Sequence, residues 1–194
     1  MAIPPVSGRD TPGTITDLLL DWREGRTGAQ DDLVPLLYQA MRQLASRHLG
    51  RERVDHTLTP TALVHEAWLR LVDQARVVAN DRVHFMAIVS RTMRFILVDH
   101  ARRRLARKRQ APDAPLPDAA ALAEVDTWAV ELVAMNDALE RLKAVDERLY
   151  RVVECRFFGG LSEEETGEVL GVSWRTVHRD WLKARSWLAL ALEA

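Results

Sequence analysis

The segment from Leu161 to Arg179 constrains the fold most, because it carries the signals of two short helices joined by a tight turn. Ser162 and Glu165 have the spacing of a capping box, which predicts the start of the first helix. Gly171 stands where a chain leaving a helix needs positive φ, and Ser173 can cap the second helix. These signals agree with one another and favour a helix-turn-helix over a plain helical hairpin with a solvated polar face.

Apolar and basic positions divide the predicted pair of helices into an inner and an outer side. The positions expected to close the two helices on each other are Val169, Leu170, Val172, Val177 and Leu182. The positions expected on the outside of the second helix are Trp174, Arg175, Thr176, His178, Arg179 and Lys183. Such donors and cations suit a DNA major groove. We expect Arg175, Thr176, His178 and Arg179 to lie near bases, and Ser173, Trp174 and Lys183 nearer phosphates.

The composition is that of a soluble globular protein. The chain has 194 residues, of which 47% are hydrophobic and 28% charged, enough for one or two domains. No apolar run approaches the roughly 18 residues that span a bilayer, and the first residues lack the pattern of a secretory signal. The single cysteine, Cys155, excludes an intramolecular disulfide framework and indicates a buried, inert thiol. We therefore expect a cytoplasmic protein without membrane association.

Motifs of catalysis and metal binding are missing. The pair His65-Glu66 starts like a zinc protease motif, but Leu69 stands where the second histidine should be. The six histidines show no other ligand spacing, and neither a phosphate-binding glycine loop nor a nucleophile elbow is present. The sequence predicts no enzyme, no metal and no cofactor.

The charge is near neutral overall but unevenly distributed. The formal net charge is −1, yet six cations fall within the segment 102–109, and acidic residues gather around Asp126 and Glu164. A local basic surface can bind nucleic acid even when the whole chain is nearly neutral. The alternative interpretation of the basic segment is a solvated helix end favoured by the helix dipole.

The hydrophobic period is helical throughout, with no convincing strand, repeat or coiled coil. Helices are expected over residues 14–24, 30–48, 60–72, 81–107, 128–142 and 147–158, followed by two helices on either side of the turn at 170–173. The region 111–124 is rich in proline and alanine and lacks a period, which indicates a linker. The predicted fold is therefore all-α: a disordered N-terminus over 1–13, a helical domain over 14–110, a flexible linker, and a second helical domain over 125–194.

The loop from Asp73 to His84 stands directly before the helix that ends in the basic segment. A base extruded from duplex DNA needs stacking and polar contacts to its edge. Asn80, Arg82 and His84 could supply such contacts beside Phe85. The alternative is a surface connection that contacts nothing.

Three segments resemble extracytoplasmic-function sigma factors of bacterial RNA polymerase: Leu63–Leu71, Phe85–Arg104 and Leu161–Arg185. These small sigma factors keep two domains, called regions 2 and 4. The resemblance implies that residues 14–110 dock on the β′ clamp helices of core RNA polymerase and melt and read the −10 element. It implies that residues 125–194 read the −35 element and meet the β flap. Promoter DNA and core RNA polymerase are thus the expected partners.

The resemblance also assigns residues in the first domain. The expected polymerase-binding residues are Leu63, Glu66, Trp68, Arg70 and Leu71. The residues expected to bind −10 DNA are Asn80, Arg82, His84, Arg91, Arg94, Arg102 and Arg103. Arginines along a helix attract backbone phosphates through counterion release.

The chain departs from the family pattern in two places. Relatives begin the docking helix with acidic residues, whereas this chain has Thr59 and Thr61. Phosphorylation of Thr59 or Thr61 by a Ser/Thr protein kinase would restore negative charge at a helix N-terminus, where anions are favoured. The alternative is that Thr59 is only an N-cap. The second departure is Phe95, where relatives carry a polar residue after the arginine that matches Arg94.

Other function classes remain open at this point. A stand-alone helix-turn-helix regulator with a helical sensor domain would not need polymerase and would dimerise on a palindrome. A helical scaffold or antitoxin would not direct transcription. Co-elution of the purified chain with core polymerase distinguishes the sigma factor from both.

Overall fold

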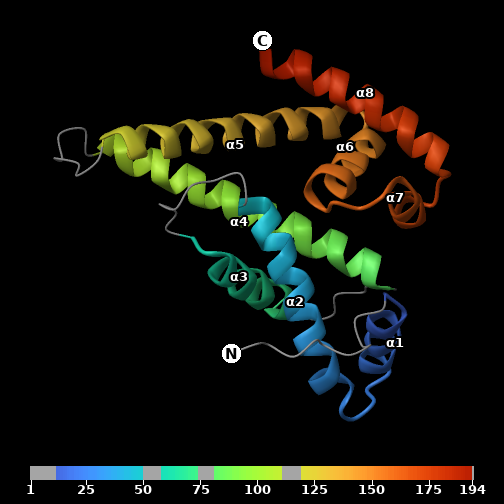
Figure 1. Ribbon diagram of the computed structural model, residues 1–194. Coiled ribbons are helices and arrows are strands. Elements are labelled where there is room, and N and C mark those ends of the chain that lie inside the picture. The colour runs from blue at the N-terminus through green and yellow to red at the C-terminus, as the bar shows by residue number, and fades with distance from the viewer. Residues whose placement is uncertain (1–11, 50–57, 74–80, 111–118, 194) are drawn as a thin grey trace, which may run out of the picture.

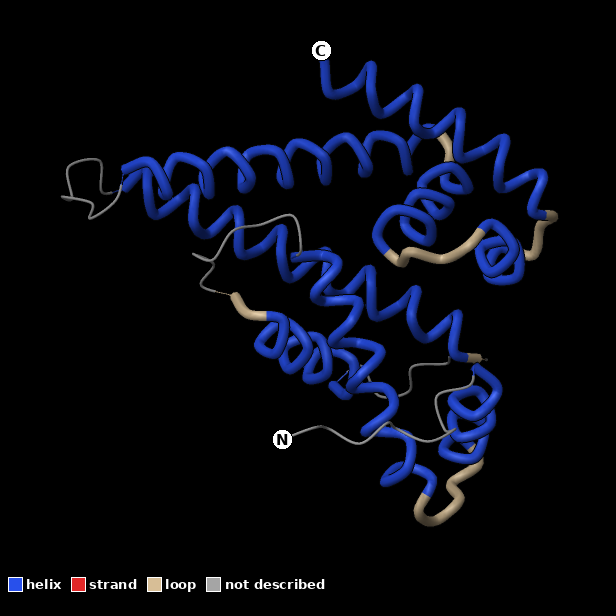
Figure 2. Tube along the Cα trace, viewed as in Figure 1, coloured by secondary structure: helices blue, strands red, loops and turns tan. Residues whose placement is uncertain are grey.

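The computed structural model describes residues 12–49, 58–73, 81–110 and 119–193 (Figure 1). Within these ranges every regular element is helical, and Figure 2 draws no strand among them. The all-α fold class is therefore confirmed. In chain order the elements are α1 (Pro12–Arg23), α2 (Ala29–Leu49), α3 (Pro60–Asp73), α4 (Arg82–Gln110), α5 (Ala119–Val145), α6 (Glu147–Val153), η1 (Glu154–Phe158), α7 (Glu163–Leu170) and α8 (Trp174–Glu193).

Local sequence signals place several helix ends where they were expected. The hydroxyl oxygen of Thr59 accepts a hydrogen bond from the backbone N–H of Ala62 at 3.2 Å, which caps α3. At α7, Ser162 Oγ accepts from the backbone N–H of Glu165 at 3.1 Å, and Glu165 Oε2 accepts from the backbone N–H of Ser162 at 2.8 Å. The predicted capping box is thus confirmed.

The N-terminal half folds around one hydrophobic cluster formed by α1 to α4. Leu37, Met41 and Leu44 recur at helical spacing on the buried side of α2. Val89 and Ile96 of α4 belong to the same cluster. Because α4 is central to this cluster, its apolar face fixes which of its arginines can reach the surface.

A second cluster holds the C-terminal half together. It joins Leu142 of α5, Tyr150 of α6, Phe158 of η1 and Leu188 of α8. Each of the two clusters has its own buried residues, and the division of the chain into two domains stays a prediction.

Helix α5 connects the two clusters. Trp128 and Leu132 pack against the N-terminal cluster, whereas Leu139 and Leu142 belong to the C-terminal one. Helices α4 and α5 are in contact, and in Figure 1 they converge toward the end of α4 and the start of α5. The two halves are therefore packed together in this structure, with α5 as the element that they share.

The last residues of the linker expected over 111–124 are helical in the structure. Helix α5 begins at Ala119, so residues 119–124 are helical, and residues 111–118 lie outside the described ranges. The run of alanines at the start of α5 explains the difference, because alanine has the highest helix propensity.

The single helix expected over 147–158 changes its winding at Glu154. Element η1 is a π-helix, in which the backbone N–H of Gly159 donates to the carbonyl oxygen of Glu154 at 2.9 Å, five residues back. Glu154, Cys155 and Phe158 are buried. Burial raises the pKa of the Cys155 thiol to about 11, which fits the expected inert thiol.

Candidate polymerase and nucleic-acid interfaces

Helix α3, the predicted docking element, directs two of its five predicted contact residues into the core. Leu63 and Leu71 are 0% and 4% exposed and belong to the N-terminal cluster. Their assignment as polymerase contacts is wrong, because a partner cannot reach them while the cluster is intact. The apolar stripe of α3 packs within its own half.

The other three predicted residues of α3 lie at the surface boundary. Glu66, Trp68 and Arg70 are half-buried, and Arg70 Nη2 lies 3.1 Å from Glu66 Oε1 and 3.3 Å from Asp99 Oδ2 on α4. Leu69, missed by the sequence reasoning, is 63% exposed and lies beside them. The signal that could have identified Leu69 is its position outside the buried apolar stripe of α3.

The N-terminus of α3 carries the two threonines considered for phosphorylation. Both Thr59 and Thr61 are exposed, and the first turn of α3 contains no acidic residue. The capping role of Thr59 is confirmed by its hydrogen bond to the backbone of Ala62. Phosphorylation stays a prediction.

At the start of α4, His84, which was expected to contact an extruded base, takes part in capping the helix. Asn80 lies outside the described residues, and Arg82 and His84 are half-buried. Asp81 Oδ1 accepts from the backbone N–H of His84 at 2.8 Å, and Asp81 Oδ2 lies 2.9 Å from His84 Nδ1. Burial acts to raise the pKa of Asp81, but the hydrogen bonds from His84 outweigh it and lower this pKa.

The four predicted arginines of α4 have two different environments. Arg91, Arg102 and Arg103 are exposed. Arg102 Nη2 lies 2.9 Å from Asp137 Oδ1 of α5, and Arg103 Nε donates to a backbone carbonyl of α4. Arg94, in contrast, is 1% exposed.

The guanidinium of Arg94 is enclosed by the C-terminal half. Its Nη1 donates to Asn136 Oδ1, its Nη2 donates to the hydroxyl of Tyr150 at 3.0 Å, and its Nε lies 2.8 Å from Glu154 Oε1. The Arg94 guanidinium carbon also lies 4.5 Å from the ring centroid of Phe95, which gives that residue a cation–π role. The assignment of Arg94 to DNA is therefore wrong for this arrangement, because every nitrogen of the group faces protein.

The turn between α7 and α8 depends on two glycines. Gly171 has a φ of 67° and ends α7 in the left-handed region. A Cβ on Gly167 would lie 2.7 Å from the carbonyl oxygen of Val172, so only glycine lets α7 approach the turn this closely. The sequence reasoning missed Gly167, although a glycine inside a helical pattern is a signal of close packing.

The apolar set expected between α7 and α8 is correct only in part. Val177 is fully buried, and Thr166 joins it from α7. Leu182 is 50% exposed, so its expected inward position is wrong. It follows His178 by one helical turn and therefore lies on the outer face. Val169, Leu170 and Val172 are half-buried.

The outer face of α8 gathers the residues predicted to bind duplex DNA. Ser173 Oγ caps the helix by accepting from the backbone N–H of Thr176 at 3.2 Å, and Thr176 is half-buried. The Arg175 guanidinium carbon lies 5.2 Å from the ring centroid of Trp174. The exposed predicted residues are Ser173, Trp174, Arg175, His178, Arg179 and Lys183. The result is a basic ridge along the first part of α8.

Two acidic side chains of the C-terminal half, Glu163 and Asp180, contact residues of this ridge. Glu163 Oε1 of α7 lies 3.0 Å from His178 Nδ1. Asp180 is fully buried, and its Oδ2 accepts from Arg148 Nε of α6 at 2.6 Å. Its Oδ1 lies 3.5 Å from Arg179 Nε. The sequence reasoning missed the contacts of His178 with Glu163 and of Asp180 with Arg148, because the residues of each pair are far apart in the chain.

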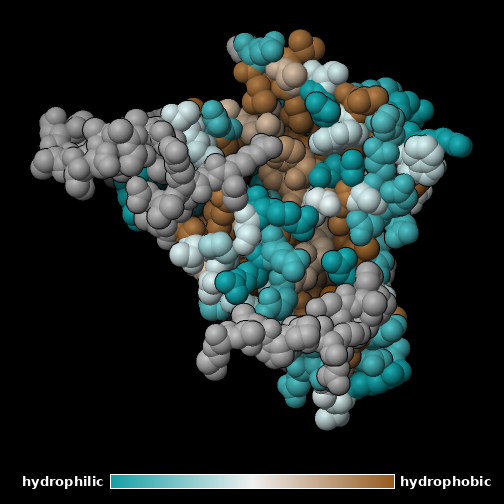
Figure 3. Space-filling model, viewed as in Figure 1, coloured by the Kyte–Doolittle hydropathy of each residue, from teal (hydrophilic) through white to brown (hydrophobic). Residues whose placement is uncertain are grey.

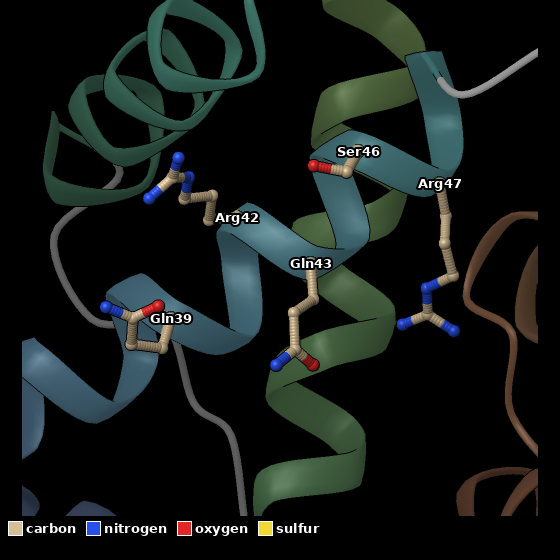
Figure 4. A pocket seen from close by; sticks show the side chains of 5 residues that line it. All are labelled: Gln39, Arg42, Gln43, Ser46 and Arg47. Atoms are coloured by element: carbon tan, nitrogen blue, oxygen red, sulfur yellow. The ribbon is translucent and has the colours of Figure 1, made fainter. Parts of the chain in front are cut away.

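Two further surface features lie outside these sites. An open groove of about 430 Å³ lies along α2. Among its lining residues, Figure 4 shows Arg42 pointing toward α3 and Arg47 toward the C-terminal half. Figure 3 shows hydrophobic atoms near the C-terminal end, where Leu190 and Leu192 are exposed.

Among the described residues, no three His, Cys, Asp or Glu side chains gather to hold a metal. Within the same ranges, every helix is too short or too polar to cross a bilayer.

The chain was compared with known proteins at the level of families, curated proteins and solved structures. The family model described as ECF sigma factor matches residues 12–194. The searches of curated proteins and of solved structures each found no match. The matched span covers both helical halves, including α3, the arginines of α4 and the capped turn before α8.

Proposed function

The chain belongs to the ECF sigma factor family, and from that premise we propose that its two halves read two separate elements of a promoter. The family acts in transcription initiation and binds core RNA polymerase and promoter DNA. We assign polymerase docking and promoter opening to residues 14–110, and duplex reading of the upstream element to residues 125–194. The match over both halves does not favour a stand-alone regulator.

The observation that carries the proposal is the basic ridge of α8 behind a capped turn. Arg175, His178 and Arg179 project from one side of the helix, and Val177 and Asp180 hold the opposite side in the domain. A recognition helix needs such a division, because its outer side chains must enter the major groove while its inner side stays packed. The proposal places Thr176 with these three near bases, and Ser173, Trp174 and Lys183 nearer phosphates.

The exposed arginines of α4 support a second DNA surface in the N-terminal half. Arg91, Arg102 and Arg103 can neutralise backbone phosphates of opened DNA. Arg82 and His84 lie at the start of the same helix and are our candidates for contact with an extruded base.

For polymerase docking, we propose the outer side of α3. Glu66, Trp68 and Arg70 reach the surface boundary there, with the exposed side chains of Thr61 and Leu69 around them. In the proposal this side meets the β′ clamp helices, and the C-terminal half meets the β flap.

Reconstituted transcription across a promoter library, with core polymerase and the full chain, tests the function. Replacement of Lys183 by alanine should weaken binding to the selected upstream duplex and lower the slope of log K against log salt by about one. The matched control is Arg151→Ala, an exposed arginine on α6, which should leave the slope unchanged. Failure of the chain to bind core polymerase or to direct initiation from any promoter would refute the proposal.

We further propose that phosphorylation of α3 regulates docking, through a Ser/Thr protein kinase. Because the hydroxyl of Thr59 already caps the helix, exposed Thr61 is the stronger candidate. A phosphate would add nearly two negative charges to a first turn that has none. Binding of Thr61→Glu to core polymerase should exceed that of Thr61→Gln. If neither Thr61→Glu nor Thr59→Asp binds more tightly, and the unmodified chain already binds fully, this regulation is wrong.

A further inference from the structure

An acidic residue, Asp180, lies on the inner side of α8 among apolar neighbours. Val177 and Ala184, about one turn before and one turn after it, are fully buried, and so is Asp180. A carboxylate that leaves water costs free energy unless hydrogen bonds and opposite charges replace its solvation. The presence of Asp180 on the packed side of the helix therefore depends on the partners that its two oxygens find.

One oxygen of this carboxylate is bound by the neighbouring helix. Asp180 Oδ2 accepts a hydrogen bond from Arg148 Nε of α6 at 2.6 Å. Helices α6 and α8 are in contact, and Figure 1 shows them next to each other. This ion pair ties the two helices together, and a purely structural role of Asp180 would need nothing more.

The other oxygen has no hydrogen bond. Asp180 Oδ1 is buried and finds no hydrogen-bond donor within the described part of the chain. Arg179 Nε lies 3.5 Å from it, which is an ion pair but too long for an N–H···O hydrogen bond. The side chain of Arg179 is 60% exposed. The acceptor is thus fixed within the domain, while the donor belongs to a side chain that can move the short distance that closes the bond.

The shape of the guanidinium decides what this bond does. The group is planar and carries N–H donors on Nε and on both terminal nitrogens. An acceptor that holds Nε restricts the plane of the group and leaves the fork of Nη1 and Nη2 for a second partner. In the major groove guanine presents two adjacent acceptors, O6 and N7, which match this fork. An arginine held at Nε is therefore suited to guanine.

We propose that Asp180 is a positioning residue that holds Arg179 for the reading of a guanine in the upstream duplex. When α8 enters the major groove, Asp180 Oδ1 accepts from Arg179 Nε, and the terminal nitrogens of Arg179 donate to O6 and N7 of the base. The inference rests on the proposed function, because it needs α8 as the recognition helix. It adds the base that Arg179 selects and the residue that keeps Arg179 oriented for it.

The test uses holoenzyme, assembled from core polymerase and the full chain, on a promoter library that varies every base pair of the upstream element. The readout is guanine discrimination, which is the initiation yield with guanine at one position divided by the mean yield with the other three bases there. Arg179→Lys keeps the positive charge at an exposed position but has no fork of donors. We expect it to lower guanine discrimination about tenfold at a single position and to leave the other positions unchanged.

Asp180→Asn tests the positioning residue itself. Asparagine has nearly the same size and still offers an oxygen to Arg148, but it lacks the charge that attracts Arg179. Guanine discrimination should fall at the position identified with Arg179→Lys. The double variant Asp180→Asn/Arg179→Lys should lose no more than Arg179→Lys alone, because both changes break one interaction.

Arg148→Gln is the matched control for loss of structure. It breaks the bond to the other oxygen of the same carboxylate and loosens the tie between α6 and α8, but it leaves Asp180 and Arg179 in place. It should keep the guanine discrimination, whatever its effect on the overall yield. An equal loss of discrimination in Arg148→Gln and Asp180→Asn would show that Asp180 acts only through packing, and would overturn the proposal.

A measurement on the wild type does not depend on how well the Asp180 variant folds. A cryo-electron microscopy structure of the holoenzyme on its selected promoter should show Arg179 Nε within about 3.2 Å of Asp180 Oδ1 and its terminal nitrogens on a guanine. Arg179 on a phosphate, or a separation no shorter than in the free chain, would overturn the positioning role.

The outcomes also separate this inference from the proposed function. Initiation from a selected upstream element at which Arg179→Lys changes no base preference would overturn the reading of guanine and leave the proposed function intact. Absence of initiation from every member of the library would overturn the proposed function and this inference with it.

Discussion

Acidification is expected to destabilise the chain through His48. The ring of His48 stacks on Phe158, and its Nε2 lies 3.2 Å from Ser90 Oγ. Burial, together with the positive charges of Arg47 and Arg94, lowers the pKa of His48 from 6.5 to about 4. The folded protein therefore holds this imidazole in its neutral form over a range in which an unfolded chain would protonate it.

The direction of the effect follows from proton binding. Between pH 6.5 and pH 4 the unfolded chain binds a proton at His48 that the folded chain does not, so the free energy of unfolding falls as the pH falls. The stabilisation is fully present above pH 6.5. Each pH unit below 6.5 removes about 1.4 kcal/mol, so lowering the pH from 7 to 5 removes about 2 kcal/mol through this one group.

Urea unfolding at pH 7 and at pH 5 measures this loss in the wild type and in His48→Gln. Glutamine keeps an amide that can bond to Ser90 but does not titrate. The absolute stability of the variant is not the readout. The readout is the difference between the two pH values, which should be smaller in His48→Gln by about 2 kcal/mol. Taking the difference cancels the carboxylates that titrate in both proteins.

An equal pH dependence in both proteins would refute the reasoning, because it would show that His48 protonates as easily in the folded chain as in the unfolded one. A second measurement separates two routes to the loss. If protonation first parts the His48–Phe158 contact, the protection of the η1 amides against hydrogen exchange, relative to an unfolded chain at the same pH, should fall at pH 5 before that of the N-terminal cluster.

Three further changes test the structure elsewhere. Gly171→Ala forces a side chain into the left-handed region and should destabilise the turn by about 1–2 kcal/mol in urea unfolding; an unchanged midpoint would contradict it. Leu142→Ala leaves a cavity at a fully buried site of the C-terminal cluster and should lower the free energy of unfolding in urea by about 2–5 kcal/mol. A smaller loss would show that this cluster is loosely packed. Thr59→Ala should lower the thermal midpoint through the loss of a cap, which contributes about 1 kcal/mol, whereas exposed Thr61→Ala should not; equal shifts would argue against the cap.

Features that depend on neighbouring residues could be predicted from the sequence. The capping box at Ser162 and Glu165, the left-handed Gly171 and the cap at Thr59 all lie where the pattern put them. Each involves residues at most three positions apart, so the local sequence contains the whole interaction. The basic ridge of α8 could be predicted for the same reason, since helical spacing alone decides which side chains share a face.

The errors occurred where a pattern has two physical causes. An apolar stripe at helical spacing arises equally from a helix that packs in its own core and from one that docks on a partner, and Leu63 and Leu71 proved to be core. The switch to a π-helix at Glu154 leaves no mark in spacing, because Tyr150, Glu154 and Phe158 keep intervals of four. The contacts of Arg94 could not be predicted either, since its partners Asn136, Tyr150 and Glu154 lie 42 to 60 residues away in the chain.

The case of Arg94 shows why a sequence motif and the folded structure can assign different roles to one residue. A guanidinium binds carboxylate and phosphate oxygens with the same fork of N–H donors. The oxygens of Asn136, Tyr150 and Glu154 therefore occupy the donors that a DNA backbone would need. Because one guanidinium cannot serve both, Arg94 cannot bind a DNA backbone while these three side chains hold it, and the arginines of α4 that can reach DNA are the exposed ones, Arg91, Arg102 and Arg103.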